Sequence, residues 1–356
     1  MEEDHGGNIT AAAQKYNLNP NEIIDFSANI NFLGPPKSVL EVLQNNLTEI
    51  KNYPDPECRT LKSVLAQQEQ LQEENLMIAN GAVDLIYLVA KVLNPNRALV
   101  LAPTFSEYRK ALENMGAEVE EFQLTRQNDF KINVEKLLPR LDEVDIFCLC
   151  NPNNPTGKFL TRTEVKEIIE YAVRYDTYIL VDEAFVDFLT EGITVIDLVT
   201  EYNNLFVLRS LTKFFAIPGL RLGYGAANKE LINKLAISHD PWNVNYFAQL
   251  AGEVALKDKG YIKETKQAIA REKEFLYQQL NNYSQRKVYY PDVNYIFVDL
   301  TASKWTASRL EEELGQEGIL IRNCNTYSGL GEEFIRIAVK NREENLVLIN
   351  KLKKLI

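Results

Sequence analysis

The residues with the clearest chemical potential lie in one segment near the middle of the chain, at 210–224. Lys213 follows the apolar run 205–208, which has the composition of a buried strand. Apolar surroundings lower the pKa of an ammonium group, which makes the amine available as a nucleophile. Ser210 precedes this lysine and Arg221 follows it, and both side chains suit a phosphate dianion. The segment therefore offers an imine-forming amine beside a phosphate site, which is what pyridoxal phosphate requires.

Two further motifs place polar side chains directly after predicted strands. The sequence NPNNPTG at 151–157 follows an apolar segment at 145–150, and its prolines fix an extended turn around Asn154. Asp182 follows the next predicted strand. A carboxylate there can pair with the protonated ring nitrogen of pyridoxal phosphate, which keeps the ring a strong electron acceptor. We expect the neighbouring Glu183 to point to the opposite side of the strand end.

The order of the predicted elements indicates how these motifs come together. Short apolar strands alternate with amphipathic helices, and we expect the strands at 98–101, 119–122, 145–150, 178–181 and 205–208. Such alternation is typical of a mostly parallel sheet covered by helices on both faces. Functional side chains should then gather where the carboxyl ends of the strands meet. A long helical region is expected from 247 to about 283, which should bridge to further strands and helices of a smaller C-terminal domain.

Together these motifs resemble the fold-type I pyridoxal-phosphate enzymes of the class I and II aminotransferase group, over essentially the whole chain. The resemblance implies an α/β fold with a large domain, built on a mostly parallel central sheet covered by helices, and a smaller α+β C-terminal domain. The expected boundaries are an N-terminal segment at 1–35 that packs on the active site, a large cofactor-binding domain at 36–245 and a small domain at 246–356.

The resemblance also assigns roles to individual residues. Lys213 would form the Schiff base with the cofactor and carry protons, Phe105 would stack on the ring with Tyr108 beside it, and Asn154 would contact the O3′ oxygen. Tyr53 would reach across a homodimer interface to the cofactor phosphate of the neighbouring subunit. The complete set of implied cofactor ligands is Tyr53, Gly81, Ala82, Val83, Phe105, Tyr108, Asn154, Asp182, Ser210, Lys213 and Arg221. The helix start at Gly81 would supply backbone N–H groups to the phosphate.

Two arginines near the C-terminus are the implied substrate ligands. Arg336 matches the arginine that binds the substrate carboxylate, and Arg322 matches a second arginine in members whose substrates carry a phosphate. Each lies in a predicted edge strand with apolar neighbours, where an arginine needs a partner for its charge. A structural salt bridge is the alternative for both. Asn154 and the N-terminal His5 complete the implied substrate site.

Two subfamilies compete for the reaction. The sequences HGGN at 5–8, DFSANIN at 25–31, DEAF at 182–185 and PWNVN at 241–245 look like the L-threonine-O-3-phosphate decarboxylases of cobalamin biosynthesis. That resemblance implies decarboxylation of L-threonine O-3-phosphate to (R)-1-amino-2-propanol O-2-phosphate and CO2. The alternative is a histidinol-phosphate or related aminotransferase that moves an amino group to 2-oxoglutarate. Such an enzyme would be expected to have tyrosine at the position of Phe185. A non-catalytic pyridoxal-phosphate-binding module is a remote third possibility.

Composition excludes several other classes of protein. The chain has 356 residues and a net charge of −11, so nucleic acid is not an expected partner. Its four cysteines lack the spacing of metal ligands, and Cys148 and Cys150 alternate within an apolar strand, which favours small buried side chains. The acidic first residues are not expected to act as a signal peptide, and no apolar run approaches the roughly 20 residues needed to span a bilayer. We therefore expect a cytoplasmic enzyme without a metal ion.

Overall fold

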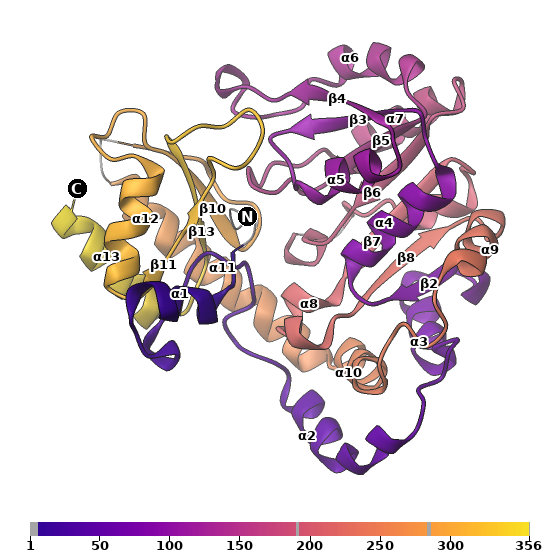
Figure 1. The fold of residues 1–356 in the computed structure, drawn as a ribbon, viewed down its shortest axis with the longest axis horizontal. Helices are drawn as coiled ribbons and strands as arrows, with labels where there is room; N and C mark the ends of the chain where they lie inside the picture. The colour runs from indigo at the N-terminus through magenta and orange to yellow at the C-terminus, as the bar shows by residue number, and fades with distance from the viewer. Residues whose placement is uncertain (1–5, 190–191, 283–285, 356) are drawn as a thin grey trace.

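The computed structural model describes residues 6–189, 192–282 and 286–355, which form a larger and a smaller sheet-based unit (Figure 1). The larger sheet has the strand order β2-β8-β7-β6-β5-β3-β4. Its strands are β2 (Leu76–Ala79), β3 (Arg97–Ala102), β4 (Glu118–Gln123), β5 (Ile146–Cys150), β6 (Tyr178–Asp182), β7 (Leu205–Ser210) and β8 (Gly223–Ala227). Only the pairings of β8 are antiparallel. The predicted mostly parallel sheet is therefore confirmed.

Helices cover both faces of this sheet because the central strands are apolar on both sides. Successive residues of β5 enter different cores: Phe147 and Leu149 pack in one, whereas Cys148 and Cys150 pack in the other. Both cysteines are buried, as expected. The covering helices are α3 (Arg59–Glu69), α4 (Ala82–Leu93), α5 (Glu107–Asn114), α6 (Val134–Leu137), α7 (Arg162–Val173), α9 (Lys229–Ser238) and α10 (Tyr246–Lys257).

The smaller unit contains an antiparallel sheet with the order β12-β13-β10-β9. Its strands are β9 (Lys287–Val288), β10 (Tyr295–Asp299), β12 (Arg322–Asn323) and β13 (Phe334–Ala338), and its helices are α11 (Lys259–Asn281), α12 (Ala307–Gln316) and α13 (Arg342–Leu355). Arg322 lies in an edge strand as expected. Strand β13 is internal, however, so the prediction of an edge strand for Arg336 is wrong. This strand pairs with β10 as well as with β12.

The first part of the N-terminal segment, through β1, joins the smaller unit, and Asn31 then bonds to the larger one at Lys213 and Phe214. Strand β1 (Ile24–Asp25) pairs in parallel with β11 (Ile319–Leu320), and α1 (Ile9–Tyr16) packs against α12. The chain then crosses to the larger unit through α2 (Lys37–Asn45) (Figure 1). The domain boundaries at 35 and 245 stay a prediction.

The helical region predicted at 247–283 consists of two helices. Asp258 separates α10 from α11. The Asp258 side chain accepts a hydrogen bond from the backbone N–H of Tyr261 and so caps α11, which is the usual role of aspartate at a helix start. Short 3-10 helices lie at Pro20–Glu22, Leu47–Lys51, Glu73–Asn75, Arg126–Asn128, Leu138–Glu143, Val186–Phe188, Ile196–Thr200 and Pro218–Leu220.

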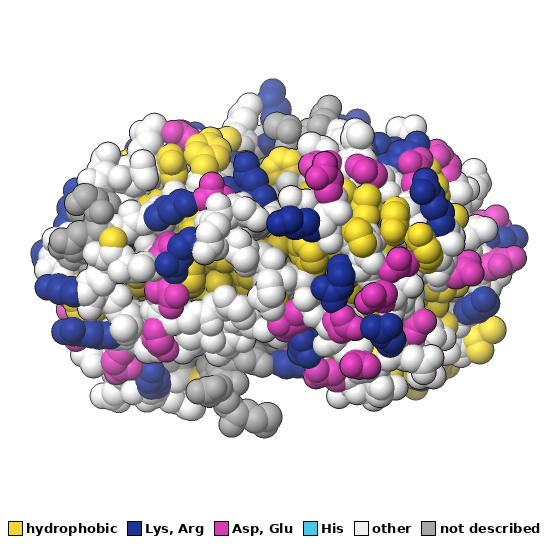
Figure 2. Space-filling view, turned by 90° about the horizontal axis from the view of Figure 1, so that it is seen from above, with side chains coloured by type: hydrophobic (Ala, Val, Ile, Leu, Met, Phe, Trp, Pro, Cys, Tyr) yellow, Lys and Arg dark blue, Asp and Glu magenta, His cyan; other side chains and the backbone are white. Residues whose placement is uncertain are grey.

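The surface agrees with the acidic composition. On the face drawn in Figure 2, acidic and basic side chains are interspersed, and no continuous basic area is visible. In the part of the chain that the structure describes, no helix has the length and apolar character needed to cross a bilayer. The same residues contain no cluster of three or more His, Cys, Asp or Glu side chains suited to a metal ion.

Candidate active site

A cavity of about 430 Å³ lies where the carboxyl ends of the larger sheet's strands face the smaller unit. Both units and the N-terminal segment contribute to its wall. The residues predicted from the sequence that line it are Val83, Phe105, Tyr108, Asn154, Asp182, Lys213, Arg221 and Arg336. The fold thus brings together side chains that are up to 253 positions apart in the chain, from Val83 to Arg336.

Lys213 lines this cavity. It lies on the single-turn helix α8 (Leu211–Phe214), directly after β7, and its Nζ atom is 3.2 Å from Ser210 Oγ. Burial lowers the pKa of the ammonium, and the positive charges of Arg221 and Arg336 act in the same direction, against the attraction of Asp182. The amine is therefore more available as a nucleophile and as a proton carrier than an ordinary lysine, as the sequence indicated.

Asp182 is held at the end of β6 by two hydrogen bonds. The Tyr108 hydroxyl donates to Oδ2 at 2.5 Å, and the backbone N–H of Ala184 donates to Oδ1 at 2.8 Å. Tyr108 is thus a ligand of the carboxylate, and its ring meets that of Phe105 edge to face at 5.7 Å. Phe105 is accordingly the better candidate of the two for stacking on a cofactor ring. Burial raises the pKa of Asp182 despite these hydrogen bonds.

This buried carboxylate predicts a pH-dependent gain in stability for the Asp182→Asn variant without cofactor. Because the pKa of Asp182 is raised in the folded state, the folded protein binds this proton more tightly than the unfolded chain. The contribution of Asp182 to stability therefore falls as pH rises above the ordinary value of 3.8. Asparagine has no charge to bury. We therefore expect the Tm of the Asp182→Asn variant to exceed that of the wild type by a margin that grows from about pH 4 to pH 7.

Thermal unfolding at a series of pH values checks this expectation. The Asp197→Asn variant is a control of opposite sign, because the hydrogen bond from Arg162 lowers the pKa of Asp197. Its loss should destabilise the protein by an amount that is nearly constant between about pH 4 and pH 7 and that shrinks as pH falls below the ordinary value of 3.8. A Tm difference for Asp182→Asn that stays constant with pH would contradict the assignment.

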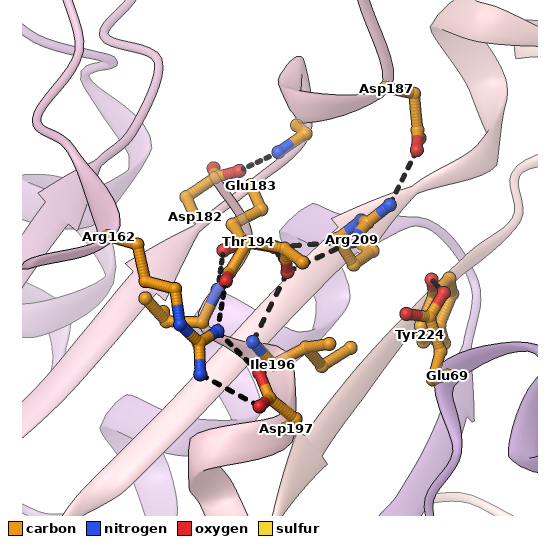
Figure 3. A network of polar contacts seen from close by, with 12 residues as sticks. Glu69, Arg162, Asp182, Glu183, Asp187, Thr194, Ile196, Asp197, Arg209 and Tyr224 are labelled. Atoms are coloured by element: carbon orange, nitrogen blue, oxygen red, sulfur yellow. Dashed lines mark hydrogen bonds and ion pairs between the residues drawn. The ribbon is translucent and has the colours of Figure 1, made fainter. Parts of the chain in front are cut away.

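Glu183 points away from the cavity, as expected. One of its oxygens accepts hydrogen bonds from Thr194 at 2.6 Å and from Arg209 at 3.2 Å, and the other accepts from the backbone of Val195 at 2.8 Å (Figure 3). Arg209 also contacts Asp187 at 2.5 Å. This buried network anchors the end of β6 to β7 and so fixes the backbone that presents Asp182 and Lys213.

An anion site is built around the start of α4. Gly81 has a φ of 88°, and a Cβ atom placed on it would lie 2.5 Å from Arg221 Nη2. A Cβ atom on Gly223 would lie 2.6 Å from the backbone nitrogen of Ala82. Only glycines therefore let the guanidinium and strand β8 approach the helix start this closely. Among the described residues Arg221 has no carboxylate partner. The positive helix end and this guanidinium suit a phosphate.

Arg336 is a buried cation without a counterion in the described part of the chain. Its side chain is 5% exposed; Nη1 donates to Asn154 Oδ1, Nη2 donates to the Ser27 carbonyl at 2.6 Å, and Nε has no partner. The salt bridge considered as an alternative is thus not formed. An unneutralised buried guanidinium is costly, so it indicates a binding site for an anion.

Arg322 faces a second cavity, of about 320 Å³, which shares Gly6 and Ser27 with the first. Its Nη2 donates to Thr326 Oγ1 at 2.8 Å, and its guanidinium lies 5.4 Å from the centre of the Tyr327 ring. It is the direct cross-strand neighbour of Arg336. The structure therefore places the two arginines side by side but in adjacent cavities, which the sequence did not indicate.

The remaining predicted residues lie outside the main cavity wall. Ser210 lies beneath Lys213, and Gly81 and Ala82 form the helix start. Tyr53 is 82% exposed and its ring is 5.0 Å from that of Trp242, so it makes no contribution to the cavity of its own chain. His5 lies outside the described residues. The next residue, Gly6, lines both cavities.

Several wall residues were missed from the sequence. Tyr327 donates to Asn154 Oδ1 at 3.1 Å, which leaves the Asn154 amide NH2 without a protein partner among the described residues. Asn29 is buried, lines the cavity, and its Oδ1 atom is unpaired. The motif at 25–31 contains polar side chains among apolar ones, and this pattern is a usable signal that Asn29 belongs to the site. No comparable pattern surrounds Tyr327.

The fold and this cavity define a pyridoxal-phosphate-dependent enzyme of fold type I. The chain belongs to the aminotransferase class I and II family, whose model matches residues 21–352. It is 35% identical to a threonine-phosphate decarboxylase of Salmonella typhimurium, covering 99% of this chain and 96% of that protein. It is 32% identical to an adenosylcobalamin biosynthesis bifunctional protein of Leptospira interrogans, covering 98% of this chain and 40% of that one. A crystal structure of the histidinol-phosphate aminotransferase from Clostridium acetobutylicum superposes with a TM-score of 0.87, at 30% identity, covering 93% of this chain and 98% of that one.

The residues present fit the family's cofactor, pyridoxal phosphate. The site at Gly81 and Arg221 has the charge and the open N–H groups that a phosphate needs. Lys213 offers an amine of lowered pKa, and Asp182 offers a carboxylate fixed by Tyr108. Phe105 provides an aromatic side chain in the wall of the same cavity.

Proposed function

We propose that the protein decarboxylates L-threonine O-3-phosphate to (R)-1-amino-2-propanol O-2-phosphate and CO2, as a step of cobalamin biosynthesis. The observation that carries this proposal is the pair of buried arginines, Arg322 and Arg336, directly opposite each other on β12 and β13. Like charges in such positions repel, and a substrate with two anionic groups offsets that repulsion. L-Threonine O-3-phosphate carries a carboxylate and a phosphate on adjacent carbons. The 35% identity to a threonine-phosphate decarboxylase supports the same substrate.

In this proposal Lys213 Nζ would attach pyridoxal phosphate, and Arg221, Ser210 and the first N–H groups of α4 would hold its phosphate. Asp182 would pair with the ring nitrogen, Phe105 would stack on the ring, and Asn154 would donate to O3′. Bound there, the cofactor would supply an electron acceptor for the bond that is cleaved at the substrate Cα. The protein selects the bond by how it holds the substrate's anionic groups.

The arginines make that selection. Arg336 binds the carboxylate and Arg322 binds the phosphate, with His5 of the N-terminal segment as a further ligand. Held at these points, the substrate presents its Cα–carboxylate bond for cleavage, and CO2 leaves with the loss of that bond. The Lys213 ammonium then returns a proton to Cα. The lowered pKa of this amine eases the transfer.

Phe185 supports decarboxylation over transamination. Its ring lines the cavity 5.6 Å from Lys213 Nζ and meets the Tyr295 ring edge to face at 5.1 Å. A tyrosine expected here in an aminotransferase would add a hydroxyl donor, whereas phenylalanine leaves an apolar wall. Histidinol-phosphate aminotransfer is the second candidate, because the Clostridium acetobutylicum enzyme superposes closely with this chain.

The reaction can be tested directly by incubating the pyridoxal-phosphate-loaded enzyme with L-threonine O-3-phosphate in the absence of any keto acid. We expect CO2 and aminopropanol phosphate to accumulate in equal amounts over many turnovers. Product formation that requires 2-oxoglutarate and yields glutamate without CO2 would identify an aminotransferase instead.

The Arg322→Ala variant tests the phosphate assignment. We expect its kcat/KM for L-threonine O-3-phosphate to fall on the order of 100-fold, since truncating one partner of a buried charge pair costs about 2–5 kcal/mol. Slow turnover of unphosphorylated threonine should change little. Arg309→Ala is the control, because Arg309 belongs to the same unit but stacks on Trp305 at 4.4 Å, outside both cavities. An equal loss with both substrates would assign Arg322 a purely structural role.

We also propose a homodimer in which Tyr53 of each subunit contacts the cofactor phosphate of the other. The high exposure of Tyr53, whose ring packs against that of Trp242, supports a role outside its own chain. Large exposed apolar side chains at Leu40, Leu47 and Ile50 precede it.

A further inference from the structure

The segment that follows α9 stabilises the turn before α4, where the phosphate site lies, through hydrogen bonds. His239 Nε2 lies 3.1 Å from Asp84 Oδ2, and the same oxygen accepts a hydrogen bond from the backbone N–H of Asn80 at 3.2 Å. That N–H group also donates to Asn243 Oδ1 at 2.9 Å. Asn243 directly, and His239 through Asp84, thus fix the N–H group of the peptide between Ala79 and Asn80, one residue before Gly81.

This peptide controls the direction of the N–H groups that the anion site offers. Gly81 is the N-cap of α4, and no side chain forms a capping hydrogen bond there. With a left-handed φ of 88° at Gly81, the N–H groups of Ala82 and Val83 point toward the anion site only if the backbone at Asn80 is fixed as well. Asp84 supplies part of this restraint from the first turn of α4, and His239 in turn fixes the Asp84 carboxylate. The hydrogen bonds from His239 and Asn80 hold the pKa of Asp84 below its ordinary value, although burial acts to raise it.

We propose that His239 and Asn243 are positioning residues for the cofactor phosphate, because they lock the turn at Asn80 and Gly81 in the conformation that aims the N–H groups of α4 at it. The inference rests on the proposed use of pyridoxal phosphate. Neither side chain lines the main cavity; both lie on a separate cavity of about 270 Å³, on the far side of the turn. They act on the phosphate through the backbone and not by contact.

The loop that carries these residues also supports Tyr53. Trp242 lies between His239 and Asn243 and has a left-handed φ of 57°. Its ring packs 5.0 Å from that of Tyr53. One short segment therefore holds both the phosphate site of its own chain and the tyrosine that we assign to the neighbouring subunit's phosphate. Loosening this segment should weaken retention of the cofactor without altering the residues that perform the chemistry.

The test is a titration of cofactor-free full-length protein with pyridoxal phosphate, followed by its absorbance change. We expect Kd to rise about tenfold for His239→Ala and for Asn243→Ala, which is the effect of losing one hydrogen bond to a charged or buried group. His239→Gln should stay near the wild-type Kd, because its amide can still donate to Asp84. At saturating cofactor, kcat should remain within about twofold of the wild type for all three variants.

Asp240→Asn is the matched control, since Asp240 lines the same far-side cavity and has no contact with the turn among the described residues. Its Kd should be unchanged. Lower Tm values for the His239 and Asn243 variants with a wild-type Kd would reduce both residues to a structural role and overturn the inference. In that case the proposed reaction would stand. Failure of the wild-type protein itself to bind pyridoxal phosphate would overturn both.

Discussion

Replacing Lys213 with alanine is expected to lower the rate of product formation on the order of 10⁴-fold, at any concentration of pyridoxal phosphate. The variant loses the amine that attaches the cofactor and also the group that returns a proton to Cα, and acid–base catalysis alone contributes about 10²–10⁴-fold. Turnover of L-threonine O-3-phosphate, measured with saturating cofactor, checks this expectation.

Lys158→Ala is the matched control for this variant. Burial lowers the pKa of Lys158 as it does that of Lys213, but Lys158 lies outside the cavity, and its Nζ atom donates to the Tyr290 carbonyl at 3.4 Å. We expect its kcat to match the wild type. Both variants should remain folded, since neither lysine forms an ion pair among the described residues. A Lys213→Ala enzyme that retains more than a few per cent of wild-type turnover would exclude this lysine as the catalytic amine.

Changing Arg336 should produce the second largest effect. For Arg336→Ala we expect kcat/KM to fall by about 30- to 5,000-fold, the equivalent of the roughly 2–5 kcal/mol lost when one partner of a buried charge pair is removed. Arg336→Lys keeps the charge but loses the planar pair of donors that binds a carboxylate, so it should recover only part of the activity. Steady-state kinetics with L-threonine O-3-phosphate measures both.

Arg126→Ala provides a comparison in the same kinetic assay. Arg126 forms an ion pair with Asp299 at 3.0 Å and lies outside both cavities, so its loss should affect stability and not kcat/KM. The assignment of Arg336 to the carboxylate would be wrong if Arg336→Ala kept a wild-type kcat/KM.

The residues at the strand ends are the part of the site that can be predicted from the sequence. Asn154, Asp182 and Lys213 each follow a strand that reads as buried, and parallel strands end at the same edge of a sheet. Their convergence on one cavity follows from that local pattern alone. The opposite orientation of Glu183 follows from the alternation of side chains along a strand.

Other features depended on tertiary packing that no local pattern encodes. Asn29 enters the wall because the N-terminal segment pairs with the smaller unit through β1 and β11, and Tyr327 enters it from the loop between β12 and β13. The separation of Arg322 from Arg336 into adjacent cavities depends on the backbone at Gly6 and Ser27 that lies between them. The division of the helical region at Asp258 has a local signal, because aspartate is a common helix cap. The role proposed for Tyr53 depends on a second subunit, so a single chain cannot define it.

The fate of the hydrogen on Cα tests the proposed reaction most directly. In the proposed decarboxylation the Cα–carboxylate bond breaks and the Cα–hydrogen bond stays intact, whereas transamination must break the Cα–hydrogen bond. The measurement is mass spectrometry of the product formed from L-threonine O-3-phosphate that carries deuterium on Cα. We predict aminopropanol phosphate that retains the deuterium, together with an equal amount of CO2. A keto acid product with the deuterium lost to water would contradict the proposed function.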